Sequence, residues 1–254
     1  MCGIGAFQIV ENEINAKRLT QALLKGLTPR GRDASGVAWH DDNENQTYIQ
    51  KMDMSGVELA KCLEEGIGST GIVHTRFATQ GDPSNNMNNH PIDARGIIGV
   101  HNGHISNDKE LFNNIHASSD YRRQAEVDSE AAFAYLAHGD SSKKDLYQRL
   151  RDIRGGAALM WLNTRGKNKY LHVARLSSSP LVFGQTHKGS VVLASTRAIL
   201  MQVAKEVGIE FEFVYELEEG EYIRFHKGRL AQQVTWETPK FSYKMPNYSQ
   251  RSLF

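Results

Sequence analysis

The strongest constraint on the fold is a series of short apolar runs that recurs along almost the whole chain. Most of them are rich in β-branched or aromatic residues and have the length of a strand. They lie at 3–10, 36–40, 47–52, 71–77, 96–103, 157–162, 170–176, 179–184, 190–195, 211–217 and 220–230. Helical patterns lie between them at 15–26, 55–66, 107–115, 128–139, 143–153 and 196–208. Because the strands come in blocks, we expect α+β layers rather than a regular βαβ sheet.

Three of the helical patterns carry end signals. Asn15 predicts an N-cap for the first helix, and Gly26 predicts its end. Ser55 begins a capping-box pattern in the second. In the third, Asn107 and Glu110 have the spacing of a capping box. Cys62 follows Leu59 on the apolar face of the second pattern, so we expect a buried core thiol there.

Charge and cysteine content exclude several protein classes. The 254 residues include 30 basic and 29 acidic side chains, without the basic excess that is typical of nucleic-acid binding. Two cysteines cannot form a disulfide framework, and no segment approaches the roughly 20 apolar residues of a membrane span. The N-terminus lacks the pattern of a signal peptide. We therefore expect a soluble cytoplasmic protein that binds neither nucleic acid nor membrane.

The domain organisation is expected to be simple. Residues 2–234 are predicted to form one domain. Residues 235–254 lack periodicity and mix aromatic with polar side chains, which predicts a C-terminal tail. The tail would either pack on the domain or bind a partner.

Cys2 stands directly behind the initiator methionine. Methionine before a small residue is normally removed, which would leave Cys2 with a thiol and a free α-amine. An α-amine with a pKa near ~7.7–8.0 can take the proton of a thiol with a pKa near ~8.5, so no separate histidine is needed as a base. The alternative is a small buried residue in the first strand. Position alone leaves both interpretations open.

Residues at the ends of two predicted strands and at the start of one predicted helix have two interpretations each. Arg76 could bind a carboxylate through two hydrogen bonds or form a structural ion pair. Asn102 and Gly103 offer the donors of an oxyanion hole, but Asn-Gly is also the strongest signal of a type I′ hairpin turn. Asp128 could be a helix N-cap or could bind the ammonium group of a ligand.

Taken in order, six motifs resemble the class II glutamine amidotransferases, glutaminase domains of the N-terminal nucleophile (Ntn) hydrolase fold. These motifs are MCGIGAF, RGRDASG, HTRFATQG, NNHP, VHNGHISN and VDSEAA. The similarity covers roughly residues 2 to 230, and HTRFATQG with VHNGHISN is most similar to the glutaminase domain of glucosamine-6-phosphate synthase. The resemblance implies a four-layer α-β-β-α sandwich with two mostly antiparallel sheets.

The resemblance also implies a reaction. Cys2, freed at its N-terminus, would attack the side-chain amide of L-glutamine, with its own α-amine acting first as base and then as acid. The Asn102 side chain and the Gly103 N–H would stabilise the oxyanion, at ~3–4 kcal/mol per donor in comparable sites. Water would then hydrolyse the thioester to glutamate. The sequence shows neither a metal-ligand cluster nor a phosphate-binding glycine loop, so we expect no metal and no cofactor.

Substrate-binding roles follow from the same resemblance. Arg76 would bind the α-carboxylate of glutamine, assisted by Thr79 and the backbone near Phe77. Asp128 would bind the α-ammonium group, with a carbonyl from Gly103.

Two further positions match the family and two depart from it. Arg30 and Gly31 would hold the loop of the nucleophile and the oxyanion environment. The synthase pattern has tryptophan where Phe77 stands and histidine where Gln80 stands, so loop closure over glutamine depends on different side chains here.

Three functions are consistent with these motifs. The favoured one is a stand-alone glutaminase subunit that delivers ammonia to a separate acceptor protein, because nothing after residue 230 resembles a synthase domain. The second is an amidohydrolase of the same fold that acts on another γ-glutamyl compound. The third is a non-catalytic glutamine-binding regulatory protein.

Overall fold

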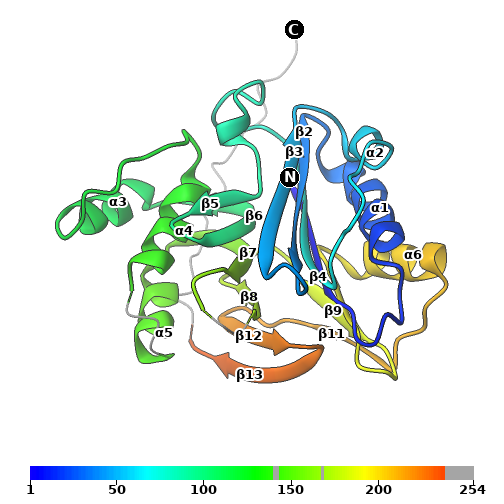
Figure 1. Ribbon diagram of the computed structural model, residues 1–254. Coiled ribbons are helices and arrows are strands. Elements are labelled where there is room, and N and C mark those ends of the chain that lie inside the picture. The colour runs from blue at the N-terminus through cyan, green and yellow to red at the C-terminus, as the bar shows by residue number, and fades with distance from the viewer. Residues whose placement is uncertain (140–142, 167–168, 238–254) are drawn as a thin grey trace, which may run out of the picture.

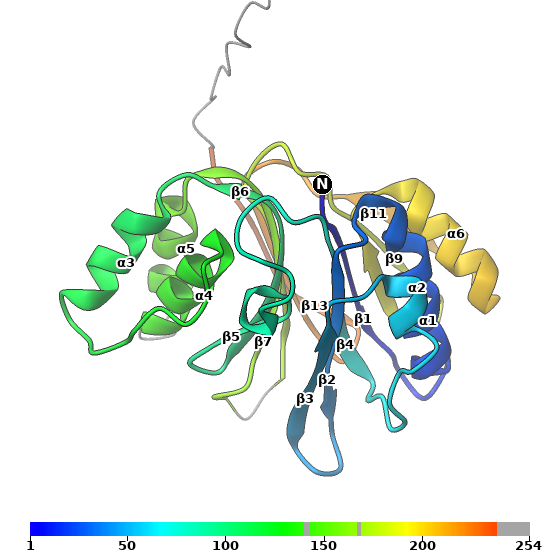
Figure 2. The same ribbon diagram turned by 90° about the horizontal axis from the view of Figure 1, so that it is seen from above.

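The structure consists of two antiparallel sheets that lie face to face, with helices on both outer faces (Figures 1 and 2). It is a computed structural model that describes residues 1–139, 143–166 and 169–237. The four layers run helix, sheet, sheet, helix, and every strand pair is antiparallel. The predicted α-β-β-α sandwich is therefore confirmed.

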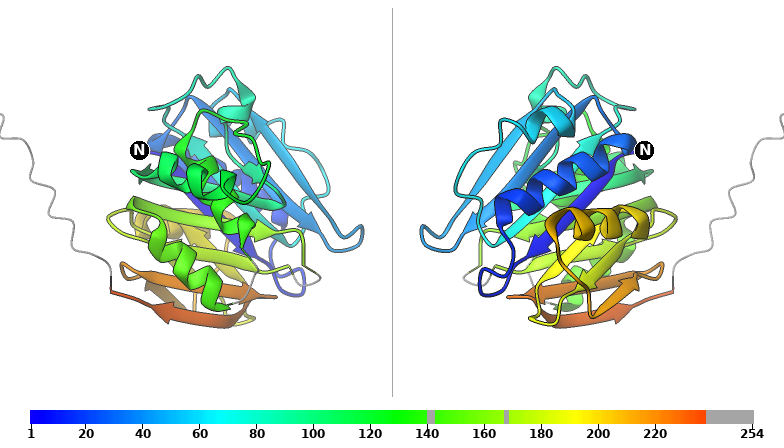
Figure 3. Two further views of the ribbon diagram at one scale, coloured as in Figure 1. Left: turned by 90° about the vertical axis from the view of Figure 1, so that its left-hand side faces the viewer. Right: turned by 90° about the vertical axis from the view of Figure 1, so that its right-hand side faces the viewer.

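The first sheet contains the N-terminus of the chain. Its spatial order is β11 (Phe213–Glu216), β9 (Val182–Gln185), β10 (Val191–Ala194), β1 (Gly3–Gln8), β4 (Thr70–Arg76), β2 (Ala34–Asp41) and β3 (Gln46–Met52). On its outer face lie α1 (Ala16–Leu27), α2 (Gly56–Leu59) and α6 (Arg197–Val207), with α1 beside α6 (Figure 3).

The second sheet is assembled mainly from the middle of the chain and its last strands. Its spatial order is β13 (Arg229–Thr235), β12 (Glu221–His226), β8 (Leu171–Arg175), β7 (Gly155–Asn163), β6 (Ile97–Ile105) and β5 (Ile92–Ala94). The helices α3 (Asp108–His116), α4 (Asp128–His138) and α5 (Lys143–Asp152) cover its outer face (Figure 2). Two short 3₁₀ helices, η1 (Thr28–Arg30) and η2 (Asn86–Asn88), complete the elements.

The apolar core forms three layers, one between the sheets and one under each helical layer. Ile4 and Ala6 of β1 pack between the sheets, whereas Phe7 packs toward the helices. This division follows from the period of two along a strand. Because both faces of β1 are buried, its sequence is almost continuously apolar.

Three local predictions are wrong. The capping box at Asn107 and Glu110 is not formed, because the Asn107 side chain bonds to the backbone of Asp152 and Arg154 instead of capping its own helix. Gly26 does not end the first helix, which runs to Leu27; a Cβ at Gly26 would lie 3.3 Å from Val203 of α6, so the glycine allows close packing of the two helices. Cys62 is exposed rather than buried, because α2 ends at Leu59 and the apolar pattern is not continued as a helix. The Asn15 cap and the Ser55 capping box are both formed.

The C-terminal tail predicted at 235–254 falls almost entirely outside the described residues. Within it, Thr235 is the last residue of β13 and Trp236 is buried. In the described ranges, none of the helices combines the length and the apolar character that crossing a membrane requires.

Candidate active site

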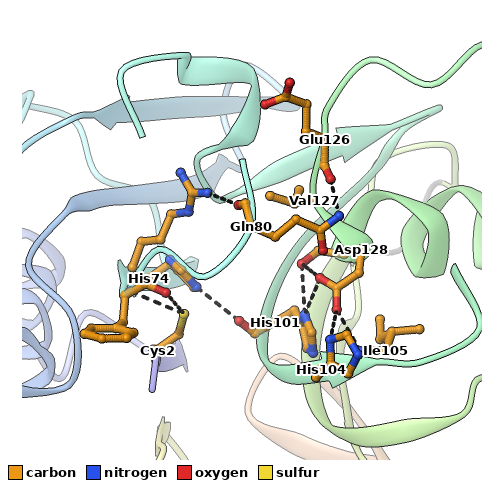
Figure 4. Close-up of polar contacts among 12 residues, drawn as sticks. Cys2, His74, Gln80, His101, His104, Ile105, Glu126, Val127 and Asp128 are labelled. Atoms are coloured by element: carbon orange, nitrogen blue, oxygen red, sulfur yellow. Dashed lines mark hydrogen bonds and ion pairs between the residues drawn. The ribbon is translucent and has the colours of Figure 1, made fainter. Parts of the chain in front are cut away.

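Cys2 lies at the start of the first sheet, beside the end of β4. Gly3 pairs with Thr75, so the next position back on β1 stands opposite Arg76. The Phe77 backbone N–H donates a hydrogen bond to Cys2 Sγ over 3.5 Å, and the Phe77 carbonyl oxygen lies 3.6 Å from the same sulfur (Figure 4). Two segments more than seventy residues apart in sequence thus surround the thiol.

The surroundings of Cys2 favour the protonated thiol. Burial raises its pKa above the ordinary value. The Phe77 N–H, the N-terminal amine and the Arg76 guanidinium lower this pKa in part, whereas the nearby Asp128 carboxylate raises it further. A base is therefore needed to generate the thiolate, and Asp128 is close enough to act on the sulfur electrostatically.

Arg30 and Gly31 connect the end of α1 to Cys2 and to the end of β4. Arg30 Nε donates a hydrogen bond of 2.8 Å to the Cys2 carbonyl oxygen. A Cβ at Gly31 would lie 2.3 Å from the carbonyl carbon of Arg76 and 2.5 Å from the Phe77 nitrogen. Only glycine allows the turn after η1 to approach the end of β4 this closely.

Arg76 is buried and already holds several acceptors. Nη1 donates to Asn89 Oδ1 over 2.7 Å, and Nη2 donates to the carbonyl oxygens of Gln80 over 2.5 Å and Gly81 over 2.8 Å. The guanidinium therefore has a fixed position and orders the loop that follows β4. Its structural role is evident, and any role toward a substrate carboxylate would add to it.

The loop after β4 reaches across to the second sheet. Phe77, Thr79 and Gln80 are all exposed at its start, and Gln80 Nε2 donates a hydrogen bond of 2.6 Å to the carbonyl oxygen of Glu126 (Figure 4). Glu126 lies two residues before Asp128. The loop thus joins the arginine end of the site to its aspartate end.

Asn102 and Gly103 lie inside β6, paired with Ala158 and Ala157 of β7, so the hairpin-turn interpretation is wrong. The Asn102 side chain is buried, and neither its oxygen nor its nitrogen has a protein partner among the described residues. Gly103 has a φ of +129°, and a Cβ there would lie 1.8 Å from the Gly156 carbonyl oxygen. β6 thus presents a desolvated amide beside a glycine that no other residue can replace without strain.

Asp128 is the first residue of α4, and its carboxylate does not act as an N-cap. Oδ2 accepts a hydrogen bond of 2.7 Å from the Ile105 backbone N–H and lies 3.3 Å from His104 Nδ1 (Figure 4). The residue therefore connects α4 to β6 just beyond Gly103. The N-cap interpretation is wrong because the backbone donor comes from the neighbouring strand.

A group of buried histidines at the junction of the sheets was missed from the sequence. His74 of β4 lies with Nε2 3.1 Å from the His101 carbonyl oxygen of β6 (Figure 4). The ring of His74 stacks on that of His90, with 4.2 Å between the ring centroids. Burial lowers the pKa of His74 to about 3, so it is neutral near pH 7. Each histidine stands inside a motif, HTRF, NNHP or VHNG, which was the signal available.

Other parts of the described molecule are separate from this site. A cleft of about 600 Å³ opens at the opposite end of β1, where Gln8, His40 and Lys169 contribute to its lining. Among the described residues, no group of three or more His, Cys, Asp or Glu side chains is arranged to hold a metal ion.

Comparison with known proteins identifies relatives of the chain. A family model described as "Glutamine amidotransferase domain" matches residues 74–202. The chain is 32% identical over 239 residues to the glutamine--fructose-6-phosphate aminotransferase [isomerizing] of Vibrio vulnificus, covering 91% of this chain and 36% of that protein. The enzyme of that name from Escherichia coli is 32% identical over 232 residues, covering 87% of this chain and 35% of that protein. The chain spans about a third of the length of these curated relatives.

Solved structures share the fold at lower sequence identity. A glutamine phosphoribosylpyrophosphate amidotransferase from B. subtilis matches with a TM-score of 0.73 and 20% identity, over 92% of this chain and 49% of that one. A structure titled as the allosteric regulatory enzyme of purine biosynthesis matches with a TM-score of 0.74 and 19% identity, over the same shares. These two likenesses concern the fold alone.

Proposed function

The chain belongs to the class II glutamine amidotransferases, and from this premise we propose that it hydrolyses the side-chain amide of L-glutamine through Cys2. The observation that carries the proposal is the Asn102 amide, which is buried without a protein partner among the described residues. A buried amide without a partner costs stability, so it needs a compensating use. Stabilising a transient oxyanion is such a use.

In the proposed reaction Cys2 acts after removal of Met1. The free α-amine takes the thiol proton, and Sγ forms a bond to the amide carbon of glutamine. The carbonyl electrons move to the oxygen, which accepts hydrogen bonds from the Asn102 side chain and the Gly103 N–H. As the intermediate collapses, the C–N bond breaks and the protonated amine gives its proton to the leaving ammonia. Water then cleaves the thioester, which releases glutamate and restores the thiol.

The raised pKa of Cys2 supports this assignment of the base. A thiol that is protonated near neutral pH cannot act as a nucleophile unless a nearby group accepts its proton. His74, the buried histidine nearest to the end of β4, already faces the His101 carbonyl oxygen and has a pKa of about 3, so it is a poor base. The α-amine on the same residue as the thiol is the better candidate.

Recognition of the amino-acid head is proposed to use both ends of the site. Arg76 would bind the α-carboxylate, with Thr79 and the Phe77 backbone beside it, and Asp128 would bind the α-ammonium group together with the Gly103 carbonyl. The contact of Gln80 with Glu126 supports this arrangement, because it fixes the loop that follows Arg76 near the segment that leads to Asp128. Phe77, with 51% of its surface exposed, is free to cover a bound glutamine.

We further propose that the ammonia is used by an acceptor site outside residues 1–237, on a separate protein. The curated relatives are named for the transfer of an amino group to fructose 6-phosphate, and about two thirds of their length lies outside the match. Affinity capture with the full chain, followed by an assay for glutamine-dependent amination in the captured fraction, tests this part. Glutamine turnover that no captured protein couples to an acceptor would contradict it.

The glutaminase proposal is tested with purified full-length chain. Intact mass should show loss of Met1, and glutamine should yield glutamate and ammonia in equal amounts. Cys2→Ala should abolish turnover, whereas Cys62→Ala, which removes the exposed second thiol, should retain it. Full activity in Cys2→Ala would refute the assignment.

Comparing glutamine with other γ-glutamyl compounds tests the substrate. A higher kcat/KM for a γ-glutamyl derivative than for glutamine would identify that derivative as the substrate, within the same mechanism. Binding of glutamine without any turnover in the Met1-free protein would favour a regulatory role.

A further inference from the structure

The imidazole of His104 stands between solvent and the Asp128 carboxylate. His104 follows Gly103 on β6, and 74% of its side chain is exposed, against 12% for Asp128. His104 Nδ1 lies 3.3 Å from Asp128 Oδ2 (Figure 4). The exposed ring is therefore an outer partner of a mostly buried carboxylate.

The other described partners of Asp128 lie on its buried side. The Ile105 N–H donates to Oδ2 over 2.7 Å, Ser129 Oγ lies 3.4 Å from Oδ1, and His101 Nδ1 lies 3.8 Å from Oδ1. Ser129 and His101 are 2% and 3% exposed. A ligand that enters from solvent therefore reaches Asp128 on the side where His104 stands.

We propose that His104 occupies the ammonium position of the substrate-free site and is displaced when glutamine binds. The inference rests on the proposed role of Asp128 as the ammonium ligand. Oδ2 already accepts one short bond from Ile105, so the longer contact with His104 is the one that an incoming group can replace. An ammonium group offers three donors and a full charge, whereas the ring of His104 offers this carboxylate a single nitrogen, so the ammonium group competes well for the position.

The competition follows from the contacts of the carboxylate. Removing the imidazole leaves Oδ2 with its short bond from Ile105 and opens the solvent side of Asp128 to an incoming ammonium group. Glutamine affinity should therefore rise when the ring of His104 is removed.

Among the described residues, two titratable groups are recorded beside His104. Asp128 comes from α4 and His101 from its own strand, and burial lowers the pKa of His101, which keeps that ring neutral. The residue opposite on β7 is Gly156, which carries no charge. The Asp128 carboxylate also acts electrostatically on the Cys2 thiol.

The test measures glutamine binding without turnover. Full-length Cys2→Ala is titrated calorimetrically with L-glutamine. Adding His104→Ala should raise the affinity about two- to fivefold, the range expected for loss of an exposed pair. His104→Asn keeps a donor near the position of Nδ1, so it should retain the affinity of the protein that carries Cys2→Ala alone. His187→Ala is the matched control, since its side chain is 76% exposed and lies 3.9 Å from Glu212.

The possible results separate this inference from the proposed function. Weaker binding in His104→Ala would make His104 a glutamine ligand and overturn the displacement. A gain in affinity as large in His104→Asn as in His104→Ala would overturn it as well. Unchanged affinity in His104→Ala, with glutamine bound, refutes the inference alone. Absence of both binding in Cys2→Ala and turnover in the wild-type chain refutes the proposed function, and the inference with it.

Discussion

Asn102→Ala should lower activity without lowering stability. Most buried polar side chains are satisfied by hydrogen bonds, and their removal destabilises the fold. Asn102 differs, because both polar atoms of its amide are buried without a protein partner among the described residues. Alanine keeps the backbone, and with it the pairing of this position to Ala158 in β7.

The expected magnitudes follow from the environment of Asn102. Each buried polar group without a partner costs about 1–3 kcal/mol, and this cost is removed with the amide. The cavity that remains, ~25 Å³, costs about 0.6 kcal/mol at ~24 cal/mol per Å³. The free energy of unfolding should therefore stay equal or rise by about 1–2 kcal/mol. Loss of an oxyanion donor should lower kcat by about 10²- to 10³-fold.

The two quantities are measured on the same Met1-free protein. Ammonia release under saturating glutamine gives kcat, and equilibrium urea unfolding gives stability. Gly103 offers no side chain for a matching change, so Asn107→Ala is the comparison: its side chain is hydrogen-bonded to the backbone of Asp152 and Arg154, and its loss should destabilise. If Asn102→Ala destabilised the fold as much as Asn107→Ala while kcat stayed unchanged, the oxyanion role would be refuted.

Three further predictions concern Gly31, the two cysteines and His74. Gly31→Ala should lower activity and should lower stability by about 1–3 kcal/mol, because the added Cβ would meet backbone atoms at the end of β4. Thermal unfolding and the ammonia assay measure the two effects, and unchanged values would contradict the close packing. At neutral pH iodoacetamide should modify the exposed Cys62 before Cys2, because burial raises the pKa of Cys2, and the rate of modification at Cys2 should rise with pH. Peptide mass mapping gives the order of modification, and faster reaction at Cys2 than at Cys62 at about pH 7 would contradict this prediction. His74 has a pKa of about 3 in the folded chain against an ordinary value of 6.5, so the unfolded chain takes up a proton first as the pH falls. The free energy of unfolding should therefore decrease below pH 6.5, by about 2 kcal/mol at pH 5 from this residue. Urea unfolding of the wild type and of His74→Gln measures the decrease, and an equal dependence on pH in the two proteins would refute the lowered pKa.

The sequence predicted the layered architecture of the fold better than the local geometry around its motifs. The α-β-β-α sandwich followed from the family resemblance, and the blocks of strands agreed with it. Asn102 and Gly103 were ambiguous because the hairpin signal is local, whereas pairing with Ala157 and Ala158 is not. Contacts more than fifty residues away decide between a turn and a strand at this dipeptide, and a local pattern carries no information about them.

Side-chain environments were predictable only where one local pattern determined them. The Ser55 capping box needs four residues in sequence, and it formed as expected. Burial of Cys62 required the helix to continue beyond Leu59, which it does not, so the thiol is exposed. The contact of His74 with the His101 carbonyl oxygen depends on how the two sheets approach one another, so the sequence could not reveal it.

The position of β1 explains why this end of the sandwich can hold such a site. β1 lies between β4 and β10, so the residue that precedes it is flanked by neighbouring strands and reaches the end of the sheet in a fixed position. Cys2 is held there through its own carbonyl, which Arg30 binds, and through the backbone of Phe77. In the proposed reaction Cys2 supplies both the nucleophile and the base, so its α-amine must stay free of structural contacts. The hydrogen bond from Arg30 to the Cys2 carbonyl meets this need, because it positions the residue without using the amine that would take the thiol proton once Met1 is removed.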